Sequence, residues 1–146
     1  MNHRNPKILL LAAALCVAGC AGEKVPQLAR VHGKVTFQGK PLTTGRVVFM
    51  PVKQGEGESR IYPASGDIKE DGSYELTTNN PGDGASIGEH KVIMEVFNAP
   101  GQGGAPAPGM TLKSIVPMKY TDPSTTPLTK TVAAGDNTID LDILPD

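Results

Sequence analysis

Few side chains in this sequence are of the types that perform chemistry. The 146 residues include three histidines and two cysteines. His32 lies on the polar face of an alternating stretch, so we expect it to face solvent, whereas His90 shares a face with Val92 and should be half-buried. No HExxH, CxxC or EF-hand pattern occurs, so no familiar set of metal ligands is present.

Acidic and hydroxyl side chains offer two further candidates for a site. Three acidic residues surround one expected turn and a fourth lies in a loop rich in Gly and Pro: Asp67, Glu70, Asp71 and Asp83. Such oxygens would suit calcium, although aspartate commonly forms turns without a metal. Ser65 has no base assigned to it and no G-x-S-x-G pattern surrounds it. The sequence therefore predicts a protein that is not an enzyme and that uses no cofactor, with calcium as an open alternative.

Cys20 has the most informative surroundings in the chain. Two basic residues, an apolar run of ten residues (8–17) and the small pair Ala18-Gly19 precede it. This order is typical of a secretory signal peptide, and the run is shorter than the roughly 20 residues of a membrane-spanning helix. The segment VAGC (17–20) also resembles the lipobox of bacterial lipoproteins. That resemblance implies cleavage before Cys20 and a thioether-linked diacylglycerol on its sulfur.

The expected processing defines the organisation of the chain. Residues 1–19 form the signal peptide, 20–29 a lipidated tether and 30–146 one domain. The mature chain would carry 12 basic and 15 acidic residues with no basic stripe, which argues against nucleic-acid binding. Cys16 would leave with the signal peptide and Cys20 would be consumed by lipid, so no disulfide is expected.

The expected location follows from the same segment. We expect an exported protein that a lipid on Cys20 attaches to the membrane. Ala21 is not the aspartate that retains lipoproteins in the inner membrane of some bacteria, which favours the outer membrane and leaves the inner membrane open.

The elements that must position these residues are short strands. Alternation in 31–37, a β-branched and aromatic run in 46–50 and alternation in 137–144 each predict a strand. The strand expected in 89–97 is apolar on both faces, which indicates a central position. No apolar pattern of period 3.6 has useful length. About seven short strands separated by turn signals predict an antiparallel β-sandwich.

Two connections have distinctive compositions. Asp71-Gly72 lies between two expected strand segments and predicts a two-residue hairpin loop of type I′. The segment 98–113 contains many Gly and Pro residues and predicts a flexible loop between strands.

The order of these segments resembles that of a known family. The stretches VHGKVTFQGKPL, EDGSYEL, GEHKV and MKYTD are similar to those of carboxypeptidase regulatory-like, or transthyretin-like, domains, over roughly 31–144. The resemblance implies a seven-stranded antiparallel Greek-key sandwich, and the lipobox in front of it resembles a group of small bacterial lipoproteins. Some transthyretin-like proteins hydrolyse 5-hydroxyisourate through a C-terminal Tyr-Arg-Gly-Ser motif, which is missing from this chain.

The expected function is therefore structural or adhesive, in the cell envelope. A carbohydrate- or peptide-binding module that serves a neighbouring enzyme or transporter is the alternative. Tyr62 and Tyr120 are the aromatic residues expected to be exposed for binding, because Tyr74 and the phenylalanines suit a core. The expected partners are the membrane and an envelope protein or a glycan.

Overall fold

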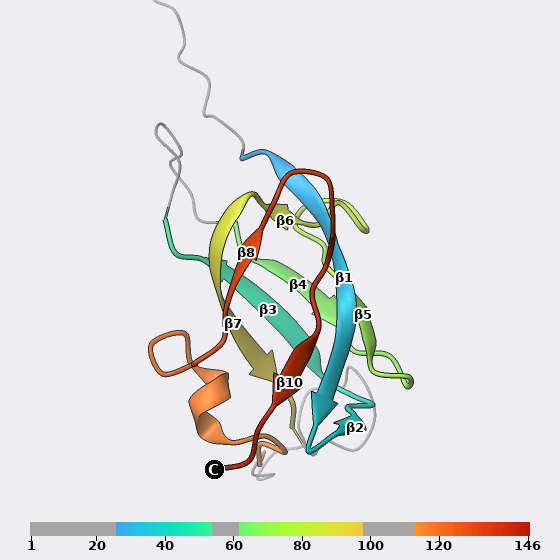
Figure 1. Ribbon diagram of the computed structural model, residues 1–146, viewed down its shortest axis with the longest axis vertical. Helices are drawn as coiled ribbons and strands as arrows, with labels where there is room; N and C mark the ends of the chain where they lie inside the picture. The colour runs from blue at the N-terminus through green and yellow to red at the C-terminus, as the bar shows by residue number, and fades with distance from the viewer. Residues whose placement is uncertain (1–25, 54–61, 98–112) are drawn as a thin grey trace, which may run out of the picture.

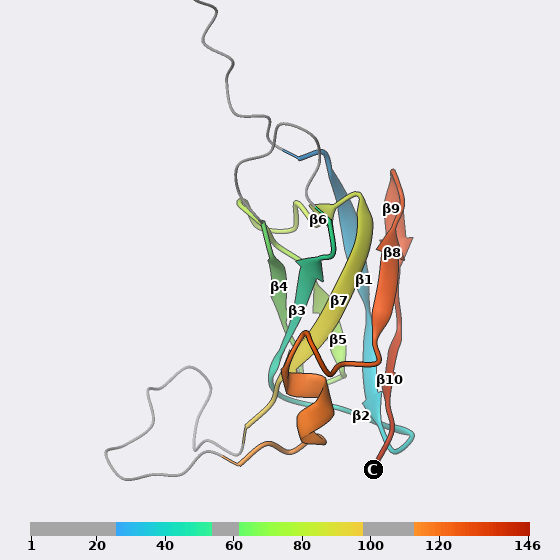
Figure 2. The ribbon, with the colours of Figure 1, turned by 90° about the vertical axis from the view of Figure 1, so that its left-hand side faces the viewer.

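The protein folds into two β-sheets that pack face to face (Figures 1 and 2). The computed structural model describes residues 26–53, 62–97 and 113–146. The first sheet has six strands: β1 (Leu28–Phe37), β2 (Lys40–Pro41), β5 (Ser73–Glu75), β6 (Ala85–Ser86), β9 (Asp136–Thr138) and β10 (Leu141–Ile143). The second sheet has four, in the order β4 (Ala64–Asp67), β3 (Arg46–Pro51), β7 (Gly88–Glu95) and β8 (Thr129–Val132). The all-β prediction is confirmed.

Regular helix is limited, in the described ranges, to one 3₁₀ turn, η1 (Met118–Thr121). Three predictions concern segments outside the described residues: the signal peptide, the lipid on Cys20 and most of the flexible loop in 98–113.

Strand β1 is the central strand of the first sheet, and the other five strands all pair with it. His32 pairs with Glu75 of β5 on one side and with Thr138 of β9 on the other. The pairing with β5 is antiparallel, as predicted, but β9 and β10 both run parallel to β1. The prediction of antiparallel pairing is therefore wrong for the C-terminal strand. Its alternating pattern fixes which face is buried, but an alternating pattern is equally compatible with either direction.

Strand β7 is central in the second sheet, as its pattern predicts. It pairs with β3 along six positions and with β8 along four. Val92 and Met94 are fully buried, while Ile93 on the other face is half-buried. A strand with neighbours on both sides and apolar residues on both faces is typical of a sheet centre.

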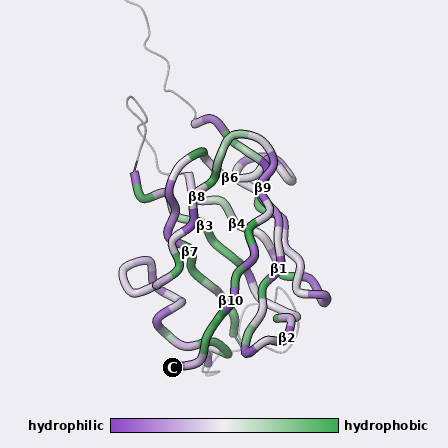
Figure 3. The backbone as a smooth tube through the Cα atoms, in the orientation of Figure 1, coloured by the Kyte–Doolittle hydropathy of each residue, from purple (hydrophilic) through white to green (hydrophobic). Residues whose placement is uncertain are grey.

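The core lies between the two sheets. Val47 and Phe49 of β3 face Val31 and Val35 of β1, and none of these four side chains is exposed by more than 1%. Hydrophobic stretches lie along strands of both sheets (Figure 3). Phe97, expected in the core, is instead 39% exposed because it lies beyond the end of β7.

The type I′ loop lies at a different hairpin from the predicted one. Gln38 and Gly39, between β1 and β2, have φ values of 53° and 74°, and a type I′ turn requires positive φ at both positions. At the predicted site only Gly72 has a positive φ, of 80°. There the N–H of Gly72 bonds to the carbonyl of Lys69, which forms a three-residue loop that ends in a left-handed glycine. The type I′ prediction for Asp71-Gly72 is therefore wrong.

Candidate functional site

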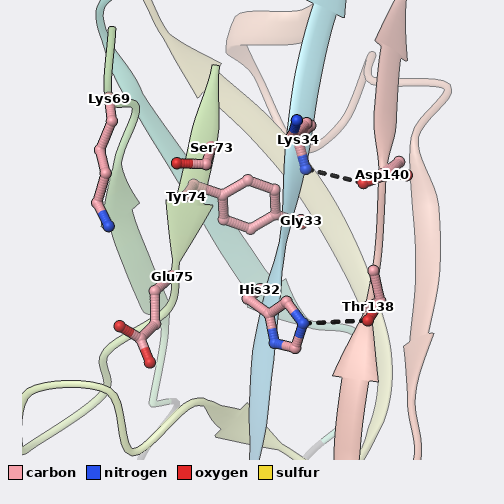
Figure 4. Close-up of a pocket in the computed structure, with 9 residues that line it drawn as sticks. All are labelled: His32, Gly33, Lys34, Lys69, Ser73, Tyr74, Glu75, Thr138 and Asp140. Carbon is pink, nitrogen blue, oxygen red and sulfur yellow. Dashed lines mark hydrogen bonds between the residues drawn. The ribbon is translucent and has the colours of Figure 1, made fainter. Parts of the chain in front are cut away.

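A shallow groove of about 640 Å³ crosses the outer face of the first sheet (Figure 4). Its lining residues come from β1, from β5, from the residue that precedes the loop 70–72, and from the C-terminal strand. They are His32, Gly33, Lys34, Lys69, Ser73, Tyr74, Glu75, Thr138 and Asp140. The volume lies within the range of sites that bind small molecules. Most of the lining residues carry polar groups, but the greater part of the surface that they present to the groove is apolar, so a ligand would meet apolar contact as well as hydrogen bonds and charges.

The floor of the groove is built around Gly33. The ring of Tyr74 lies on the inner side of the sheet and its hydroxyl donates a hydrogen bond of 2.6 Å to the carbonyl of Ile139, on the far side of β1. A Cβ on Gly33 would lie 2.0 Å from that carbonyl oxygen, so only glycine fits without displacing the backbone. The backbone of the C-terminal strand therefore packs directly against this glycine.

The same close approach interrupts the C-terminal strand. The carbonyl of Ile139 is turned toward Tyr74, which separates β9 from β10. The side chain of Asp140 accepts a 2.8 Å hydrogen bond from the backbone N–H of Lys34. The carboxylate of Asp140 thus takes the place of a backbone carbonyl as the acceptor. This groove residue therefore stabilises the contact between β1 and the C-terminal strand.

Burial has a clear effect on Tyr74. Its side chain is almost fully buried, and burial, reinforced by the charge of Asp140, raises the pKa of Tyr74 far above the ordinary value. The hydroxyl therefore remains protonated and remains a donor at any physiological pH.

A chain of acid, imidazole and hydroxyl runs from Asp136, outside the groove, to His32 and Thr138 in its lining. Asp136 Oδ1 lies 3.3 Å from Nδ1 of His32, and Nε2 of His32 lies 3.1 Å from Oγ1 of Thr138. This is the order of groups in a hydrolase triad. No local pattern predicts this chain of groups, because His32 and Thr138 are more than a hundred residues apart and meet only through the parallel pairing of β1 with β9.

The backbone around Thr138 does not suit catalysis. In serine hydrolases of the nucleophile-elbow type, the N–H of the residue after the nucleophile stabilises the oxyanion. Here that N–H belongs to Ile139 and donates a 2.8 Å hydrogen bond to the carbonyl of His32. Side chains of paired residues on one face of a sheet lie close together simply because of the strand register, so the contact of His32 with Thr138 requires no catalytic role. The three side chains therefore clamp β9 to β1.

Two cations line the groove, and the charge of one of them, Lys34, helps to lower the pKa of Asp71. Among the residues that the structure describes, the ammonium groups of Lys34 and Lys69 make no hydrogen bond or ion pair. A second recess of about 370 Å³ shares Lys69 and Glu75 with the groove and continues past the edge of β5 to Ser65 and Arg46. Ser65 is thus placed beside the groove, where its backbone exchanges hydrogen bonds with Thr77.

The acidic residues considered for calcium do not come together. Asp67 forms an ion pair of 2.8 Å with Arg46. Asp71 accepts hydrogen bonds from the N–H and hydroxyl of Ser73, which lower the pKa of Asp71. Within the described ranges, no three His, Cys, Asp or Glu side chains are grouped to hold a metal ion.

Asp83 has a structural task of its own. Its carboxylate accepts hydrogen bonds of 2.7–2.9 Å from the backbone N–H groups of Thr78, Asn79 and Asn80. Burial opposes its ionisation, but these hydrogen bonds outweigh burial and lower the pKa of Asp83. This carboxylate organises the loop between β5 and β6 and has little capacity left for a cation.

His90 is more buried than its pattern predicts. The residue has no exposed surface, its ring lies 5.7 Å from the ring of Phe49, and its Nε2 lies 2.7 Å from the carbonyl oxygen of Ser86. Burial lowers the pKa of His90, so the imidazole is neutral at pH 7. A fully enclosed ring in the core is not accessible to a ligand.

The two tyrosines expected at the surface differ. Tyr62 is partly exposed, two residues before β4. Tyr120 is only 3% exposed, and its hydroxyl accepts a hydrogen bond from the N–H of Leu144. The expectation that Tyr120 is exposed is therefore wrong. Polar neighbours in the sequence suggested a loop, but the 3₁₀ turn η1 directs this ring into the core.

No family model, curated protein or solved structure matches the chain. No helix in the described parts of the chain is long and apolar enough to cross a membrane. The groove is therefore interpreted from its own geometry.

Proposed function

We propose that this protein is an exported lipoprotein that displays one non-catalytic β-sandwich at a membrane surface, in a structural or adhesive role. The lipid would be attached to Cys20, with the outer membrane as the preferred location. The proposal that the protein is not a catalyst depends on one observation: the side chains that could react already make hydrogen bonds that hold strands together. His32, Thr138 and Asp140 all make bonds between strands, and the N–H that would serve an oxyanion is already bonded.

The number of principal strands supports the finer assignment to a transthyretin-like, Greek-key sandwich. The strands β2 and β6 have two residues each, and β9 and β10 are one strand interrupted by the Tyr74 contact. If β2 and β6 are treated as extensions and β9 and β10 are counted as one strand, seven principal strands remain. Three of them lie in the first sheet and four in the second. Seven strands in two sheets are typical of such sandwiches.

The anchor is tested by metabolic labelling with palmitate. The wild-type chain should be labelled and processed, and Cys20→Ala should lose both labelling and cleavage. Labelling that persists in the Cys20→Ala chain would contradict a lipid at this position.

A carbohydrate- or peptide-binding module remains the second candidate, and the groove is the observation that favours it. Lys34, Lys69 and the exposed Glu75 offer donors and acceptors to a polar ligand. The lipidated protein should be incubated with a glycan panel and with solubilised envelope proteins. Lys34→Ala combined with Lys69→Ala is the test variant, and Lys40→Ala on the exposed β2 is the matched control.

The two candidates predict different results. A structural or adhesive role predicts that retained partners are the same in all three proteins, because the groove is not used. Capture of a glycan or peptide that the double variant loses and the Lys40 variant keeps would establish the binding module instead.

A further inference from the structure

The described chain enters β1 at one particular end of the sandwich (Figures 1 and 2). That end also carries β6 and the connection between β8 and β9, whereas the C-terminus and η1 lie at the opposite end. Gln27, just before β1, is fixed there because its carbonyl accepts a 3.0 Å hydrogen bond from the N–H of Ile87. Only six residues, 21–26, separate this fixed point from Cys20.

This short connection limits where the domain can be. Seven Cα–Cα steps reach at most about 25 Å when the chain is fully extended. Strand β1 has ten residues and spans about 30 Å from one end of the sandwich to the other. A lipid on Cys20 can therefore bring the β6 end onto the bilayer, whereas the same tether is too short to bring the C-terminal end there.

Two aliphatic side chains are exposed at the end that the tether reaches. Ile87 is 42% exposed and Val52 is 43% exposed. The N–H of Val52 bonds to the carbonyl of Glu89, two residues after Ile87, so the two residues lie near each other at the same end of the second sheet. The exposed neighbours Lys53 and Glu89 carry opposite charges, so they neither attract nor repel an anionic lipid surface as a pair.

We infer that Ile87 and Val52 form a membrane-contact surface, with the lipid bilayer as partner, which holds the sandwich upright on its β6 end. The inference rests on the proposed lipid at Cys20. A contact of two aliphatic residues is weak by itself, but a short tether gives a local concentration in the millimolar range, at which weak contacts are occupied. The end with η1 and the C-terminus then faces away from the bilayer.

The test compares two exposed apolar positions at opposite ends of the domain. The full lipidated protein carrying Ile87→Cys or Met118→Cys is labelled with bimane and placed in phosphatidylcholine–phosphatidylglycerol nanodiscs that contain doxyl-labelled lipid. Met118 is the matched control because it is 69% exposed but lies in η1 at the far end. Val52→Cys replaces Ile87→Cys if the latter does not fold.

We expect doxyl quenching of the label at position 87 and none at position 118. Inserting 20 Gly and Ser residues after Glu23 should lower the effective concentration at the contact about sevenfold, because this concentration falls roughly as the −3/2 power of tether length, and quenching at position 87 should therefore decrease. Equal quenching at both positions, or quenching at neither, would overturn the inference. Palmitate labelling of the same preparations separates the two proposals. Without label the lipoprotein proposal and the inference both fail, and with label but no quenching at position 87 only the inference fails.

Discussion

Substitution of Gly33 by alanine probes the contact on which the first sheet depends. The φ angle of Gly33 is one that any residue adopts, so the backbone itself tolerates alanine. The obstacle is space, because the new Cβ would lie 2.0 Å from the carbonyl oxygen of Ile139 and 2.6 Å from its carbon. Neither atom is the end of a flexible side chain, so the C-terminal strand must move away from β1.

The cost can be worked from the bonds that this movement breaks. They are the bond from Tyr74 to the Ile139 carbonyl, the bond from the Ile139 N–H to His32, and the bond from the Lys34 N–H to the Asp140 carboxylate. Two neutral bonds at about 1 kcal/mol each and one bond to a charged acceptor at about 1.5–3 kcal/mol give a loss of about 3.5–5 kcal/mol. For a domain of this size the melting temperature should fall by roughly 10–20 °C.

Thermal unfolding followed by circular dichroism measures this loss directly. Gly39→Ala is the control, because that glycine has a φ of 74° but no atom within 4 Å of the added Cβ. It should cost only the strain of a left-handed alanine, about 1–2 kcal/mol. If Gly33→Ala melts within a few degrees of the wild type, or no lower than Gly39→Ala, the steric account of the sheet is wrong.

Three further substitutions have defined outcomes. Tyr74→Phe should cost about 1–2 kcal/mol in denaturant unfolding, because the carbonyl of Ile139 loses its partner; an unchanged midpoint would contradict a role for the hydroxyl. Asp83→Ala should cost about 2 kcal/mol and speed hydrogen exchange at the N–H groups of residues 78–80, and unaltered exchange would refute the loop-organising role. The unfolding free energy should decrease below about pH 6.5, by up to about 1.4 kcal/mol per pH unit, because the unfolded chain protonates His90 while burial keeps the folded imidazole neutral. His90→Gln should flatten that part of the pH profile, and a slope that persists in this variant would assign the effect to another group.

Much of the fold was predictable because strand patterns are local. The alternation in β1 and the two apolar faces of β7 assign each residue to the inside or the outside without knowledge of its partners. Direction of pairing is not local. The parallel pairing of β9 and β10 with β1 depends on how the chain crosses between the sheets, and the pattern of the strand contains no information on that crossing.

The candidate site was less predictable for the same reason. The contact between His32 and Thr138 and the crossing of Tyr74 over Gly33 join residues from strands far apart in the chain. Gly33 gave the one sequence signal, as a glycine on the apolar face of a strand. Tyr120 was misplaced because the 3₁₀ turn that directs its ring inward is too short to produce a recognisable pattern.

The pairing of the first strand with the last also constrains the order of folding. Contacts such as that between the Lys34 N–H and Asp140 join residues 106 positions apart, so the sheet cannot close until nearly the whole chain is available. Proteins dominated by such non-local contacts fold slowly, in milliseconds to seconds. A chain that is threaded across a membrane from its N-terminus would thus remain without its closing strand until the final residues emerged. If the chain is exported as proposed, slow closure of this kind would keep it unfolded during passage, and the domain would assemble after the crossing.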